Sequence, residues 1–348
     1  MVLSGAFCIF ALDFLGRMAH HQSTPLSKYE RLTRFCRHWS LPLSMLAGAT
    51  AYFLYSAVPG HECLGPLLRA VLDVVQPLLI FCMLFVAFCK VEISALRLER
   101  WHVLLLLVQF LVFSGAVVAL SQCSNDAWRI GLESLMLCFI CPTATAAAVV
   151  TAKLGGNAAS LVSYTIASNL LAAVAVPLLL PLAQTQGGTD FLPALILILS
   201  RVFPLLICPL LAAAFVRRCF PRFHRYILGK RDLAFRIWIF ALALAIALST
   251  QALVNTRAGV DFVLLIAGVS LLSCLLQFLI GRLVGVSYGE PISAAQALGQ
   301  KNTVFAIWLA YTFLSPVTAL AGGFYSVWHN VVNSWQLRRA MKAENSDE

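Results

Sequence analysis

The sequence predicts an all-helical membrane protein in which two membrane helices are interrupted near mid-depth. Of its 348 residues, 60% are hydrophobic and only 11% are charged, whereas a soluble domain carries roughly 25% charged residues. Apolar runs recur ten times along the chain, each long enough as a helix to cross, or nearly cross, about 30 Å of hydrocarbon. Two of these runs contain helix-breaking or polar residues near their centre. We therefore expect a multi-span protein that lies in the lipid bilayer.

The expected spans follow an N-terminal extension, residues 1–40, and precede a cytoplasmic tail, residues 338–348. The extension holds a short apolar run of about ten residues, which is too short to cross a bilayer. The ten expected spans are 41–58, 72–90, 101–121, 130–152, 157–182, 190–216, 233–253, 260–285, 292–312 and 314–337.

Lysine and arginine are distributed unevenly among the segments that connect these spans. If both termini are cytoplasmic, twenty of the 25 basic residues lie on the cytoplasmic side and three on the other side. The remaining two, Arg201 and Lys301, fall inside spans. Cytoplasmic loops carry such an excess of positive charge. We therefore expect a multi-pass protein of the cell (inner) membrane with both termini in the cytoplasm. This orientation in the membrane explains the net charge of +10, so we expect no nucleic-acid partner.

The spans are expected to form two inverted repeats of five. Residues 41–216 hold the first repeat and span six, residues 217–236 form a basic cytoplasmic loop, and residues 233–337 hold spans seven to ten. Spans six to ten make up the second repeat. An odd number of spans per repeat inverts one repeat relative to the other, as in many secondary transporters.

The two interruptions fall in the fourth span of each expected repeat. The first is the stretch from Cys141 to Ala148, in which Pro142 removes a backbone donor. The second runs from Gln296 to Asn302 and includes Gly299. In lipid, backbone groups freed by a break are tolerated only inside the protein or along a wet cavity. Paired interruptions of this kind indicate a transporter's binding site.

Charged residues inside the spans are candidates for function, because charge is costly in a bilayer. Lys301 lies at the second interruption, where its side chain cannot easily reach either interface. Arg201 lies in the middle of span six, and its role stays open. Broken helices also offer free N–H groups and positive dipole ends. These residues favour an organic anion as the transported molecule.

Other classes of function have less support from the sequence. Cys138 and Cys141 form a C-x-x-C pair without a second pair or a nearby histidine, which favours packing over a metal site. No serine nucleophile with a nearby base is evident, so we expect neither an enzyme nor a cofactor. A cation/proton antiporter would need aspartates in mid-span, and none is present. A membrane sensor or scaffold remains the alternative, although no signalling domain is expected after span ten.

Several residues along the chain match the pattern of a known transporter family in type and spacing. They are Pro142, Thr145, Ala146, Val149, Thr151, Gly156, Asn157, Thr165, Ser168 and Pro177, then Gln109 between Val108 and Phe110, then Gly299 and Asn302, and finally the run from Phe324 to Asn330. In these motifs, residues from about 41 to 337 resemble the bile acid:sodium symporter family.

The resemblance implies the family's architecture and its substrate contacts. Spans four and nine would cross at the centre, and a core of spans three to five and eight to ten would move against a panel of spans one, two, six and seven. The implied substrate contacts are Thr145, Asn302, His329 and Asn330. Lys301 joins them as the charge beside an anionic substrate.

The family's sodium sites are only partly kept. Gln109 and Thr165 match the family's ion ligands. The other ligand positions carry Ala147, Ala148, Leu161, Ala297 and Lys301, so the family's carboxylate is missing. We hypothesise that the Lys301 ammonium replaces a bound sodium ion, and proton-linked transport also stays open.

The sequence therefore predicts a secondary transporter that works by alternating access. Its substrate would be an organic anion such as a bile acid or a pantoate-like acid, carried without sodium coupling of the family's type. The alternatives are a sensor or scaffold that does not transport, and an ordinary sodium-coupled symporter.

Overall fold

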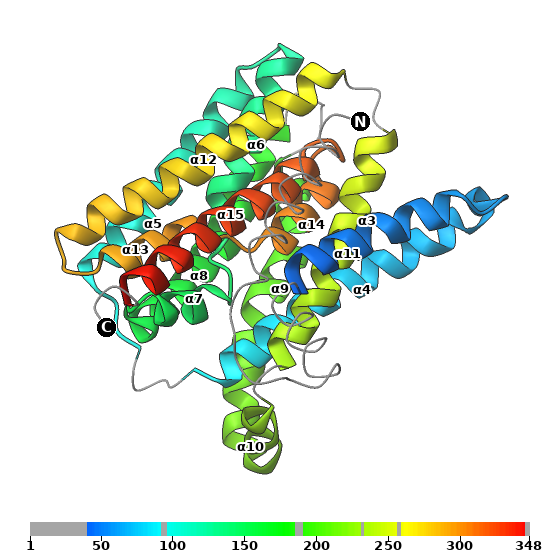
Figure 1. Ribbon diagram of the computed structural model, residues 1–348. Coiled ribbons are helices and arrows are strands. Elements are labelled where there is room, and N and C mark those ends of the chain that lie inside the picture. Colours follow the sequence, from blue (N-terminus) through cyan, green and yellow to red (C-terminus); the bar gives the residue numbers. More distant parts are fainter. Residues whose placement is uncertain (1–39, 92–95, 185–190, 231–232, 256–258, 345–348) are drawn as a thin grey trace. The chain divides into compact units, whose positions relative to one another are not determined.

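In the computed structural model, residues 40–91, 96–184, 191–230, 233–255 and 259–344 are described, and every regular element among them is a helix (Figure 1). The predicted extension, residues 1–40, lies outside them apart from Ser40. The chain divides into two compact units, Met1–Leu43 and Ser44–Glu348. The second unit holds all described helices except the start of the first. The helices are α3 Ser40–Ser56, α4 His61–Cys89, α5 Arg100–Ser121, α6 Asp126–Ile140, α7 Ala147–Lys153, α8 Ala158–Gln184, α9 Phe191–Cys219, α10 Pro221–Gly229, α11 Leu233–Asn255, α12 Val260–Val286, α13 Pro291–Gly299, α14 Thr303–Phe313 and α15 Ala319–Glu344.

Helices cover each of the ten predicted spans, and many are long and apolar. Six helical segments of the described chain are long and apolar enough to cross a membrane: Gly65–Cys89, Arg100–Ser121, Ala158–Ala183, Phe191–Cys219, Leu233–Asn255 and Val260–Val286. The chain is therefore a multi-pass membrane protein. Helices α6 and α7, and likewise α13 and α14, are each too short to cross alone, because a break separates the two members of each pair.

The helices differ from the predicted segments at three places. The segment 217–236, predicted as a loop, contains α10, whose first residue is Pro221, and proline is well tolerated at that position. Helix α4 begins at His61 rather than at residue 72, with Pro66 accommodated near its first turns. Helix α15 continues to Glu344 through the first residues of the predicted tail, since no proline or glycine stops it there.

The helices of the second unit pack in two groups, which are joined by α8 packing against α9. In one, α4 packs against α9 and α11, and Gly48 of α3 lies directly against the backbone of α11 at Ala243. In the other, α12 packs against α13, α15 and α6, while α5 packs against α6 and α8. Helix α14 contacts both groups, through α4 and α11 on one side and α15 on the other.

Close packing of α12 on α13 depends on two glycines four residues apart. A β-carbon at Gly281 would lie 2.8 Å from the Cα of Ala295, and one at Gly285 would lie 2.8 Å from the Cα of Pro291. Small residues at this spacing let membrane helices approach closely. This contact holds α13, and therefore the second break, against α12.

Candidate functional site

The two helix breaks meet and pair with each other. Helix α6 ends at Ile140 and α7 begins at Ala147, while α13 ends at Gly299 and α14 begins at Thr303. Thr143 and Lys301 form an antiparallel bridge between the two breaks. Both breaks fall where the sequence predicts them.

Backbone hydrogen bonds hold this bridge. The N–H of Asn302 donates to the carbonyl of Pro142 at 2.8 Å, and the N–H of Ala144 donates to the carbonyl of Gln300 at 3.0 Å. An unsatisfied backbone group in hydrocarbon costs several kcal/mol. Each break therefore satisfies backbone groups that the other one frees.

Side chains at the bridge also cap the opposite helix. The hydroxyl of Thr143 donates to the carbonyl of Ala297 in the last turn of α13, at 2.7 Å. The amine of Lys301 donates to the carbonyl of Phe139 in the last turn of α6, at 3.1 Å. Each break thus supplies a donor to the C-terminal end of the other broken helix.

The end of α6 is the better capped of the two. The last carbonyl groups of a helix have no partner within the helix. Here each has a side-chain donor: Gln277 donates to Cys138, Lys301 to Phe139, and Gln109 to both Ile140 and Cys141. Four buried acceptors are therefore covered by three side chains, which come from α5, α12 and the second break.

The ammonium of Lys301 has no carboxylate partner within the described parts of the chain. The side chain is 1% exposed and ranks among the largest fully buried ones. Its charge faces the C-terminal end of α6, where the helix dipole places a partial negative charge. Helix dipole and carbonyl oxygen thus take the role that a carboxylate would otherwise have.

A glutamine and a tyrosine support each break. The hydroxyl of Tyr164 donates to the side-chain carbonyl of Gln109 at 3.2 Å. On the other side, the amide of Gln277 donates to the hydroxyl of Tyr325 at 3.0 Å, and Tyr325 donates to the carbonyl of Gly299 at 2.9 Å. Gln109 and Tyr164 lie on the predicted spans three and five, and Gln277 and Tyr325 on spans eight and ten. Of these four residues, only Gln109 and Tyr325 belong to the motifs identified in the sequence.

The predicted substrate contacts lie at or near the breaks. Asn302 caps the start of α14, and its side-chain oxygen accepts the N–H of Phe305 at 3.2 Å. His329 packs edge-on against Tyr325, with 5.7 Å between the ring centroids. Thr145 lies half-buried in the first break, while the amide of Asn330 donates to the carbonyl of Ser326 within α15. The structure thus brings Lys301 and Asn302 directly to the bridge and links His329 to it through Tyr325.

Two of these residues carry buried polar atoms without a protein partner. The side-chain nitrogen of Asn302 and the Nδ1 atom of His329 are both buried and make no hydrogen bond to any described residue. A buried polar atom left unpaired costs roughly 1–3 kcal/mol. Both atoms are therefore free to bond a polar ligand.

Four of the five positions predicted as altered ion sites, all but Lys301, lie in or against one apolar cluster. Ala147, Leu161 and Ala297 are fully buried in it together with Trp101 and Tyr164. Ala148 packs against the same cluster.

The retained ion-site positions are occupied by protein contacts. The amide of Gln109 caps α6, and the hydroxyl of Thr165 donates to the carbonyl of Leu161 at 3.0 Å. A hard cation needs several oxygen ligands. The residues present do not fit a sodium ion of the family's type.

One serine does lie beside a histidine, although the sequence analysis saw no such pair. The Nε2 atom of His102 is 3.0 Å from the hydroxyl of Ser160, which donates to the Glu99 carboxylate at 2.7 Å. The Nδ1 atom of His102 accepts the N–H of Glu99 at 3.1 Å, so in the neutral ring Nε2 carries the proton. His102 therefore cannot take the proton of Ser160, and the cluster caps the start of α5.

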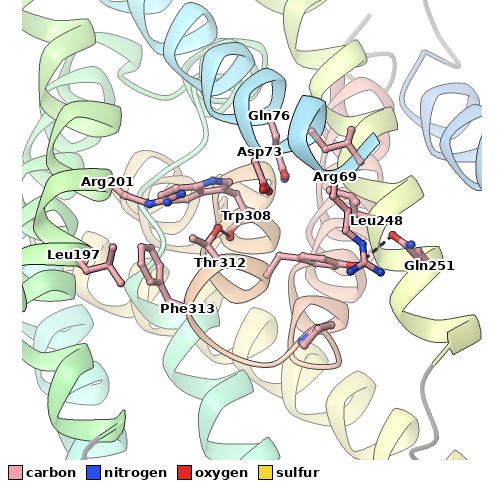
Figure 2. A pocket seen from close by; sticks show the side chains of 13 residues that line it. Arg69, Asp73, Gln76, Leu197, Arg201, Leu248, Gln251, Trp308, Thr312 and Phe313 are labelled. Atoms are coloured by element: carbon pink, nitrogen blue, oxygen red, sulfur yellow. Dashed lines mark hydrogen bonds between the residues drawn. The ribbon is translucent and has the colours of Figure 1, made fainter. Parts of the chain in front are cut away.

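A pocket of about 450 Å³ lies between α4, α9, α11 and α14. Figure 2 shows Arg201 entering from one side, Asp73 and Gln76 from another, and Thr312 between them. Arg69 also lines the pocket, but none of the five predicted substrate contacts does. The sequence analysis singled out Arg201 without finding a pocket. The available signal was the stripe of Arg69, Asp73 and Gln76, whose spacing puts them on one face of a helix.

Comparison with known proteins gives a family match over most of the chain. The model of the SBF-like CPA transporter family matches residues 45–322. The "Probable sodium/metabolite cotransporter BASS1, chloroplastic" of Arabidopsis thaliana is 27% identical over 201 residues, which cover 58% of this chain and 49% of the relative. The "Uncharacterized sodium-dependent transporter YocS" of Bacillus subtilis (strain 168) is 29% identical over 203 residues, 56% of this chain and 59% of the relative. The matched part thus spans between one half and three fifths of each relative's length.

Proposed function

This chain belongs to the SBF-like CPA transporter family, and we propose that it is a secondary transporter that moves an organic anion across the membrane by alternating access. The family match confirms the resemblance to bile acid:sodium symporters and favours a transporter over an enzyme. A bile acid or a pantoate-like acid is the kind of substrate we propose. We propose that this transport is not coupled to sodium in the way that is typical of the family.

The apolar cluster at the altered ion-site positions carries the proposal. Leu161 and Trp101 are buried in one apolar cluster with Ala147 and Ala297, and none of these four side chains offers an oxygen ligand. The nearby ammonium of Lys301 is fixed to the end of α6. A positive charge at this place would give the broken helix the electrostatic support that a bound cation would give.

We further propose ten spans in two inverted repeats. The Gln–Tyr pair of α5 and α8 and the Gln–Tyr pair of α12 and α15 support this, because each lies on the third and fifth expected spans of its repeat. The panel would be α3, α4, α9 and α11, and the core would be the remaining long helices and the broken pairs. Both termini would face the cytoplasm, and the protein would lie in the cell (inner) membrane.

The predicted contacts Thr145, Asn302, His329 and Asn330 remain our proposal for the substrate site at the crossing. The unpaired atoms of Asn302 and His329 support it. Lys301 would act there as a fixed charge behind the site, because its side chain is buried and its amine is already bonded.

Uptake into proteoliposomes tests this function. We expect labelled taurocholate or pantoate to accumulate in vesicles that contain the protein, at the same initial rate in sodium chloride as in choline chloride. Protein-free vesicles are the control. A strict requirement for sodium would contradict the uncoupled mechanism, and binding of these anions without any flux would favour a sensor instead.

A further inference from the structure

The pocket between α4, α9, α11 and α14 carries more positive than negative charge. Arg69 and Arg201 both line it, and Asp73 is the only carboxylate among its lining residues. In the described part of the chain, no side chain forms an ion pair with Arg201. A guanidinium inside a membrane helix is costly unless it faces water or a partner. An anionic ligand bound in this pocket could therefore pair with the guanidinium of Arg201.

Gln76 adds an independent sign of a ligand. It lines the same pocket and is 4% exposed, and its side-chain nitrogen has no hydrogen-bond partner among the residues that the structure describes. An amide donor that is buried and unpaired is unfavourable. A ligand atom that accepts a hydrogen bond would satisfy it.

The rest of the lining is suited to an apolar body. Leu197, Leu248, Trp308 and Phe313 form much of the remaining wall. The volume of about 450 Å³ lies within the range of small-molecule sites, which are mostly apolar with a few placed polar groups. The lining thus combines an anion-binding end with an apolar compartment.

We propose that this pocket binds an organic anion that joins one carboxylate or sulfonate to an apolar body. The guanidinium group of Arg201 would bind the acidic group, with the Gln76 amide as a further donor, and Arg69 on the other side of the pocket would add positive charge (Figure 2). Arginine binds such groups through paired hydrogen bonds. This assignment names the substrate class and first docking site of the transporter proposed above, and in that sense it rests on the proposed function. Binding itself can be measured without transport.

Helix α14 runs from the pocket to the place where the two helix breaks meet. Thr312 of the pocket and Asn302 of the crossing lie at opposite ends of α14, ten residues or about 15 Å apart along its axis. An anion docked at the arginines would therefore lie one short helix away from the paired breaks.

Ligand-dependent thermal stability of the purified protein in detergent tests the assignment. The probes are phenylpropionate, phenylethanesulfonate and the neutral phenylpropanamide. We expect both anions to raise the melting temperature in a saturable manner and the amide to have no effect. Arg201→Gln should weaken binding of phenylpropionate by about tenfold or more, and Arg201→Lys should weaken it less, because it keeps the charge but loses the paired donors.

Controls separate this inference from its alternatives. Arg282→Gln removes an exposed arginine of α12 outside the pocket and should bind phenylpropionate like the wild type. Arg69→Gln removes a positive charge that lines the pocket and should weaken this binding. Equal binding of acid and amide, no binding of any probe, or an unchanged affinity in Arg201→Gln would overturn the proposal. So would stabilisation by phosphatidylglycerol nanodiscs that blocks the probes, because the site would then belong to a lipid head group. Binding without flux would refute the proposed function and leave this inference standing.

Discussion

Replacing Lys301 with methionine is expected to destabilise the protein by about 1–3 kcal/mol, the cost of a buried acceptor left without its donor. Methionine has a similar length and no charge. The variant leaves the Phe139 carbonyl unpaired, since Gln277 and Gln109 already cover the neighbouring carbonyls of α6. It also removes the positive charge that faces the negative end of this helix.

The melting temperature in detergent measures this effect. Lys153→Met is the matched control, because Lys153 is exposed at the end of α7 and should lose little. Burying a charge has its own cost, and its removal can stabilise a protein. A melting temperature of Lys301→Met at or above that of Lys153→Met would show that the ammonium is not needed to hold the break.

Replacing Gly281 with leucine is expected to have the largest effect on folding. The β-carbon would lie 2.8 Å from the Cα of Ala295 and closer still to the carbonyl oxygen of Ala294. Both contacts are with backbone, so no side chain can rotate away. Overpacking typically costs about 1–3 kcal/mol and sometimes more, and here α13 would have to move away from α12 and pull the second break with it.

Gly268→Leu provides the comparison on the same helix. Gly268 is exposed, and a β-carbon there meets nothing within 4 Å. We expect Gly268→Leu to elute as a single peak on size-exclusion chromatography with a near wild-type melting temperature, and Gly281→Leu to aggregate or fail to accumulate. Similar behaviour of the two variants would mean that α12 and α13 are not in the close contact described here.

The positions of the breaks could be predicted because their cause is local. Pro142 cannot continue a helix, and the polar run around Gly299 and Lys301 is unfavourable in an apolar span. The loss of the family's ion ligands stays a prediction, since it depends only on residue types at the positions that the resemblance matches. The packing of Trp101 and Leu161 with Ala147 and Ala297 could not be predicted in this way.

Partners far apart in the sequence could not be predicted. Lys301 and Phe139 are separated by 162 positions, and Gln277 and Cys138 by 139. No periodicity identifies which carbonyl an amine will reach. The pocket was missed for the same reason, because its residues come from four helices and only Arg201 was conspicuous on its own.

The central claim is that a fixed ammonium stands in for a sodium ion at the crossing of the broken helices. The most direct test compares melting temperatures of the purified protein, without substrate, in sodium, potassium and choline chloride at equal ionic strength. A sodium site filled at 100 times its Kd would stabilise the fold by about 2.7 kcal/mol. The account predicts the same melting temperature in all three salts, and a saturable rise specific to sodium would contradict it.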